Sequence, residues 1–135
     1  MLFNLFLALL LGGFATLIAY LVNRRRDDSP SVPKSSLPVQ IDRSDFEHPN
    51  GTWLLVFFSS DTCDSCTKVR DLIYDMPLES VHVQEVSFPK GERLHLRYGI
   101  DSVPIVLIAD FEGVVTWSYA GVPSAELLGD AISNL

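Results

Sequence analysis

Two cysteines three positions apart are the residues of this sequence best suited to chemistry. Cys63 and Cys66 are its only cysteines in 135 residues. A disulfide between them would close too small a loop to stabilise a fold substantially. A secreted scaffold held together by disulfides would be expected to carry four or more cysteines. The pair is therefore expected to act chemically, as two thiols that form and break a disulfide.

The position of the pair in the chain predicts a role for each cysteine. Residues 53–58 form a continuous apolar run, typical of a strand buried on both faces, and Cys63 then opens a stretch with helical spacing. Backbone N–H groups at the start of a helix favour negative charge, and the thiolate is the reactive form of cysteine. We therefore predict that Cys63 is the nucleophile. Cys66, one turn further and more buried, would then resolve the mixed disulfide formed at Cys63.

The elements that must hold this pair follow from apolar periodicity and turn residues. A short helical turn before Phe46 is expected to be capped by Asp42 or Ser44. Strands linked by helices imply parallel pairing, and a hairpin turn at 110–113 adds an antiparallel pair. The expected fold class is α/β, a mixed sheet with helices on its faces. The predicted strands are 39–41, 53–58, 81–86, 103–109 and 114–119, and the predicted helices are 63–76, 91–98 and 124–132.

On these residues the sequence resembles the thioredoxin family over nearly all of 39–135. The matching features are the strand 53–58, the Cys63–Cys66 pair, the segment Tyr98–Pro104, the hairpin around Gly113, and Gly121. The resemblance implies the thioredoxin fold, with helices on both faces of the sheet. It also implies that the peptide bond before Pro104 is cis, that Pro104 faces the dithiol, and that the backbone of Val103 pairs with a bound substrate segment.

The sequence departs from the family pattern close to the cysteines. Thr62 stands where thioredoxins carry a tryptophan, and Asp64-Ser65 replaces the Gly-Pro between the cysteines. In the family, a buried acid helps to move the proton of the resolving cysteine, and Phe57 occupies its position in this sequence. Asp61 and Asp64 add negative charge near Cys63, and like charge disfavours a thiolate. These departures favour a dedicated partner over general activity on many substrates.

The first 22 residues are almost wholly apolar. As a helix they would span about 33 Å, enough to cross the core of a bilayer. No basic residue precedes the run and no small-residue cleavage site ends it, which favours a retained transmembrane anchor over a signal peptide. Arg24, Arg25 and Arg26 follow it, and the positive-inside rule then puts the rest of the chain in the cytoplasm. Residues 23–38, rich in proline and serine, are expected to be a linker to the domain at 39–135.

Charge and the scatter of the histidines exclude other classes of function. Residues 39–135 hold 15 acidic and 6 basic side chains, a balance that repels nucleic acid. His48, His82 and His95 are too scattered to form a zinc site with the cysteines and are expected at the surface or at strand edges. We expect no metal and no cofactor.

The leading hypothesis is a membrane-anchored thiol–disulfide oxidoreductase that acts on a protein thiol or disulfide close to the membrane. A binding or scaffold module of the same fold, with a static disulfide or idle thiols, is the alternative. A redox sensor that signals through its anchor is a third reading. Whether the pair cycles with a reductant separates the first two.

Overall fold

The computed structural model of the chain describes residue 1, residue 6, residues 12–18 and residues 37–135. Residues 12–18 are helical. Within these described ranges no helix has the length and apolar character needed to cross a membrane. The arginine cluster at 24–26 and most of the predicted anchor and linker lie outside the described residues.

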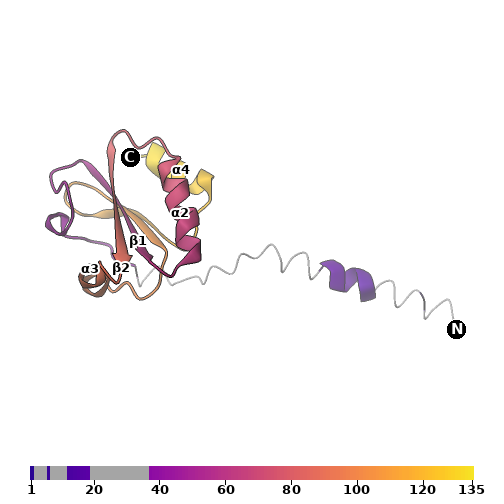
Figure 1. The fold of residues 1–135 in the computed structure, drawn as a ribbon. Coiled ribbons are helices and arrows are strands. Elements are labelled where there is room, and N and C mark those ends of the chain that lie inside the picture. The colour runs from indigo at the N-terminus through magenta and orange to yellow at the C-terminus, as the bar shows by residue number, and fades with distance from the viewer. Residues whose placement is uncertain (2–5, 7–11, 19–36) are drawn as a thin grey trace.

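A four-stranded mixed sheet in the order β2-β1-β3-β4 forms the centre of the domain (Figure 1). The central strand β1 (Trp53–Ser60) pairs in parallel with β2 (Val81–Phe88). On its other side β1 pairs antiparallel with β3 (Ile105–Ala109), which in turn pairs antiparallel with β4 (Val115–Ala120). The parallel pairing predicted for helix-linked strands is confirmed for β1 and β2, and the predicted hairpin is confirmed for β3 and β4.

The predicted strand at 39–41 is present only as one antiparallel bridge, flanked by hydrogen bonds from Ile41 N–H to the Gly113 carbonyl at 2.8 Å and from Val115 N–H to the Val39 carbonyl at 3.0 Å. Gln40 forms only an isolated bridge with Val114. Directly afterwards the Asp42 carboxylate accepts the N–H of Ser44 at 2.9 Å, which begins the short 3-10 helix η2 (Arg43–Asp45). This turn bends the chain away before a ladder can extend.

Three α-helices complete the domain, and local signals set one boundary of each. α2 (Asp64–Tyr74) stops two residues short of the predicted Met76, because Pro77 disfavours a helical backbone at the residue before it. α3 (Glu92–Arg97) is closed by Gly99, whose φ is +64°. α4 (Ala125–Ser133) begins at Ser124, whose Oγ accepts the N–H of Leu127 at 3.1 Å, as the cap prediction requires.

The helices cover both faces of the sheet, as the resemblance implies. α2 and α4 pack on one face, here called the α2–α4 face, and α3 packs on the other with the segment 37–46, here called the α3 face (Figure 1). Leu37, two residues before the expected domain boundary, is already buried in the α3 face. The core of the α2–α4 face consists of Leu55, Phe57, Cys66, Val69, Ile73, Val81, Val106, Ile108 and Leu128.

Candidate functional site

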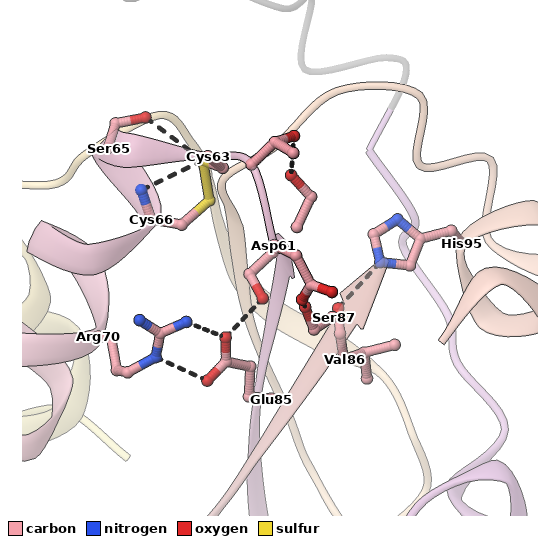
Figure 2. Close-up of a disulfide and its surroundings, with 12 residues drawn as sticks. Asp61, Cys63, Ser65, Cys66, Arg70, Glu85, Val86, Ser87 and His95 are labelled. Carbon is pink, nitrogen blue, oxygen red and sulfur yellow. Dashed lines mark hydrogen bonds and ion pairs between the residues drawn. A yellow bond between two sulfur atoms is a disulfide. The ribbon is translucent and has the colours of Figure 1, made fainter. Parts of the chain in front are cut away.

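Cys63 and Cys66 form a disulfide at the start of α2 (Figure 2). Cys63 is the N-cap of the helix, and its Sγ accepts the backbone N–H of Cys66 at 3.2 Å. Ser65 Oγ lies 3.6 Å from the same sulfur. Cys63 is half-buried, whereas Cys66 is only 1% exposed. Cys63 is therefore the more accessible of the two, as the predicted role of nucleophile requires.

This geometry can support thiol–disulfide exchange. After reduction, the N–H of Cys66 and the first turn of an eleven-residue helix would stabilise negative charge on Cys63. A partner's disulfide can reach the half-buried Cys63, and the mixed disulfide so formed is within one helical turn of Cys66. Attack by Cys66 would then release the partner and restore the bond seen here.

The loop before β3 lies against the same part of the core. Val103 packs against the cluster that also contacts Cys63. The Val103–Pro104 peptide bond is cis, as the resemblance implies, and Pro104 is buried. The Pro104 carbonyl accepts the N–H of Gly121 at 2.9 Å, which ties this loop to the end of β4.

The comparisons with known proteins agree with this arrangement. Over 95 residues the chain is 34% identical to the thioredoxin-like protein SkfH of Bacillus subtilis, in an alignment that covers 64% of this chain and 67% of that protein. The chain belongs to the thioredoxin-like proteins. No family model matches it.

Solved thioredoxins share the fold of this thioredoxin-like protein at low identity. The thioredoxin of Malassezia sympodialis is 21% identical, with a TM-score of 0.56 over 73% of this chain and 90% of that one. Mitochondrial thioredoxin 3 of Saccharomyces cerevisiae is 12% identical, with a TM-score of 0.56 over 64% of this chain and 82% of that one. These likenesses support the thioredoxin-like fold and say nothing of substrates.

Position 57, where the family carries a buried acid, holds Phe57 in this chain, but the neighbouring strand β2 carries Glu85 beside it. Phe57 is 1% exposed and packs in the core with Cys66. Its register partner on β2 is Glu85, so the two side chains leave the sheet on the same face. An acid at position 57 would therefore stand next to the Glu85 carboxylate. β2 therefore supplies a carboxylate, that of Glu85, at the position paired with residue 57.

Glu85 belongs to a small polar network that sequence reasoning missed. Its carboxylate accepts hydrogen bonds from Arg70 Nε at 2.9 Å, Arg70 Nη2 at 2.6 Å and Ser59 Oγ at 2.5 Å (Figure 2). The bonds from Arg70 lower the pKa of Glu85, against burial, which raises it. The spacing of Arg70 and Glu85 in the sequence could have indicated that both side chains lie on the α2–α4 face. Arg70 follows Cys66 by four residues, on the same side of the helix, and Glu85 lies two residues after the inward-facing Val83.

The two aspartates near the cysteines differ in where they point. Asp61 Oδ1 accepts a hydrogen bond from Ser87 Oγ at 2.8 Å, so this carboxylate is directed toward β2 and not toward the sulfurs (Figure 2). Asp64 is the first residue of α2 and is exposed. Of the two charges predicted to oppose a thiolate at Cys63, that of Asp61 is tied to β2 by a side-chain hydrogen bond, whereas Asp64 makes no such bond to the described residues.

The histidines do not all lie where they were expected. His82 is exposed and stacks on His48, with ring centroids 4.6 Å apart. His95, however, is only 5% exposed, so the expectation of a surface histidine is wrong there. Its ring packs edge-on against Phe58 and Phe88, and its Nε2 lies 2.9 Å from the Val86 carbonyl oxygen. In the part of the chain that the structure describes, no three histidine, cysteine or acidic side chains form a group that could hold a metal ion.

Proposed function

We propose that this thioredoxin-like protein is a thiol–disulfide oxidoreductase in which Cys63 attacks and Cys66 resolves. The observation that carries the proposal is the disulfide at the start of α2, with one half-buried and one fully buried cysteine. In the dithiol form, the Cys63 thiolate attacks a disulfide of the partner and the displaced partner sulfur leaves as a thiolate. Cys66 then loses its proton and attacks Cys63, which releases the second partner thiol and closes the Cys63–Cys66 bond.

The partner in this proposal is a dedicated protein near the membrane. Residues 1–22 act as the transmembrane anchor, residues 23–38 as the linker, and Arg24, Arg25 and Arg26 hold the domain in the cytoplasm. The cytoplasm keeps thiols reduced, so the resting form would be the dithiol and would donate electrons. The backbone of Val103, next to Pro104, would pair with the substrate segment. The apolar run and the arginines that follow it support the anchor and its orientation.

Trapping experiments test the roles of the cysteines. We expect the Cys66→Ser variant to accumulate mixed disulfides with partner proteins and the matched Cys63→Ser variant to accumulate none. Trapping by Cys63→Ser alone would reverse the assignment. If the disulfide of the wild-type protein cannot be reduced and re-formed in a glutathione redox buffer, the pair is static and the scaffold alternative holds.

A protease protection experiment tests the orientation separately. Protease added outside intact cells should leave the domain uncut, and it should cut the domain once the membrane is permeabilised. Digestion in intact cells would put the domain in an oxidising space, with a different source of electrons. The exchange chemistry at Cys63 would survive that result.

A further inference from the structure

A pocket of about 260 Å³ lies where β1 and β2 end, at Ser60 and Phe88. Its walls are mostly apolar and include Ser60, Phe88, His95, Leu96, Ile100 and Val103. Two of these residues join the pocket to the site. The Ser60 carbonyl accepts the N–H of Cys63 at 3.2 Å, and Val103 packs against the core that Cys63 also contacts. A substrate segment whose sulfur reacts at Cys63 would pass close to this pocket.

The size and lining of the pocket suit one aromatic ring. An engineered apolar cavity of roughly 150 Å³ binds benzene, so a pocket of about 260 Å³ has room for a larger aromatic side chain. Phe88 and Leu96 are 43% and 75% exposed, which leaves apolar surface in water. A ring in the pocket would cover part of that surface, a favourable change.

His95 adds a hydrogen-bonding group to the wall of this pocket. The Val86 carbonyl can only accept, so the nitrogen facing it, Nε2, carries the hydrogen. In the neutral ring Nδ1 is then an acceptor. No residue among those described donates to Nδ1, and this nitrogen points away from Val86 (Figure 2). The edge-on contacts of the ring with Phe58 and Phe88 hold it in this orientation.

We propose that this pocket binds a tyrosine side chain of the substrate protein, next to its reacting cysteine, and that His95 Nδ1 accepts the hydrogen bond of the phenol. The inference rests on the proposed exchange function, for which it names a substrate class. The apolar walls select the ring and Nδ1 selects the hydroxyl, because a phenylalanine in the same place would cover this acceptor without giving it a donor.

The charge around the pocket adds a second requirement on the substrate. Asp101 lines the pocket, and both Asp101 and Asp64 are exposed. The domain as a whole is acidic, with 15 acidic and 6 basic side chains in residues 39–135. A basic segment around the tyrosine and cysteine would therefore be attracted to this surface.

Two synthetic peptides, Lys-Tyr-Cys-Lys and Lys-Phe-Cys-Lys, test the proposal. Each carries its cysteine as a mixed disulfide with a coloured aryl thiol and is mixed with the full-length, pre-reduced protein in detergent. The dithiol is oxidised to the Cys63–Cys66 disulfide, and the peptide thiol and the aryl thiolate are released. We expect the tyrosine peptide to react about two- to tenfold faster, the range of one net hydrogen bond.

Two substitutions of His95 separate recognition from structure. His95→Gln can still donate to Val86 from the position of Nε2 but has no acceptor at the position of Nδ1, so the preference for tyrosine should disappear. His95→Asn keeps an acceptor near Nδ1 and loses the bond to Val86, so the preference should remain even if the protein is less stable. The exposed Leu127→Ala on α4 serves as the control and should change neither rate.

Each outcome decides between the proposals. Equal rates for the two peptides with wild-type protein, or a tyrosine preference that survives in His95→Gln, would overturn the role of His95 while leaving the exchange function intact. Failure of the reduced protein to react with either peptide would overturn the exchange function, and the inference with it.

Discussion

The two faces of the sheet bury different kinds of side chain beside the same disulfide. On the α2–α4 face Cys66 lies among apolar residues, and the polar groups nearby, Arg70, Glu85 and Ser59, bond to one another. On the α3 face the buried His95 lines a pocket, and only one of its two ring nitrogens has a hydrogen-bond partner among the described residues. A face whose polar groups are satisfied internally suits a redox pair that must return to one geometry. A face with an unused acceptor suits recognition of a partner.

The largest effects should come from truncating the core of one face at a time. Leu128 is fully buried on the α2–α4 face with Cys66, and Leu94 is buried on the α3 face. We expect Leu128→Ala and Leu94→Ala each to reduce the free energy of unfolding by about 2–5 kcal/mol, measured by denaturant titration. Only Leu128→Ala should speed the alkylation of Cys66 in the reduced protein, because only that cavity adjoins its core. Equal acceleration in both variants would show that the faces are not independent.

Substitution of Gly113, in the hairpin turn before β4, tests how closely the hairpin backbone packs on the segment 37–46 of the α3 face. Gly113 has φ +83°, and a Cβ there would collide with the carbonyl oxygen of Ile41, whose side chain is buried on the α3 face. Gly113→Ala should therefore cost about 2–4 kcal/mol of stability. Gly129 in α4 is the matched control. A Cβ there meets nothing within 4 Å, so Gly129→Ala should stabilise the protein by about 0.5–1 kcal/mol. A neutral Gly113→Ala would contradict this description of the hairpin.

The Glu85 network predicts a pH-dependent contribution to the stability of the α2–α4 face. The bonds from Arg70 lower the folded-state pKa of Glu85 below 4.5, so its stabilisation is complete above that pH and is lost as the pH falls through the folded pKa. Glu85→Gln should cost on the order of 1 kcal/mol at neutral pH, and the difference should vanish in acid. Glu79→Gln, at an exposed position, should show no such pH dependence. A difference that persists in acid would mean that the side chain acts through packing.

The smallest effect concerns charge at the cysteines. Asp64→Asn should lower the pH midpoint for alkylation of Cys63 by less than about one unit, because solvent screens an exposed charge. Asp61→Asn is the comparison and should have a weaker effect, because its carboxylate is bonded to Ser87. A larger shift from Asp61→Asn would show that this carboxylate turns toward the sulfur in the reduced protein.

The features that sequence predicted correctly are those set by local rules. The cap at Ser124, the end of α3 at Gly99 and the position of the cysteines at a helix start all depend on residues within a few positions of one another. The continuous apolar run at 53–58 was enough to identify β1 as a strand buried on both faces. The resemblance supplied the cis bond before Pro104, which no local pattern predicts.

The features that sequence missed depend on contacts between distant segments. His95 reads as an exposed histidine of a short helix, and only the packing of α3 against Phe58 and the Val86 carbonyl buries it. The pairing of Arg70 with Glu85 requires the register of β2 against β1, which the sequence does not specify. The strand expected at 39–41 is a local exception, because η2 begins directly after Asp42 and leaves room for a single bridge from Gln40.

The positions of the two tryptophans have a practical consequence. Trp53 and Trp117 are the only tryptophans of the chain, and both pack against the α2–α4 core. Tryptophan fluorescence, excited selectively, therefore originates beside the layer that holds the disulfide. An emission change on reduction would report on that layer directly. Loosening of α3 alone would leave the emission unaltered, and a second spectroscopic label would be needed to see it.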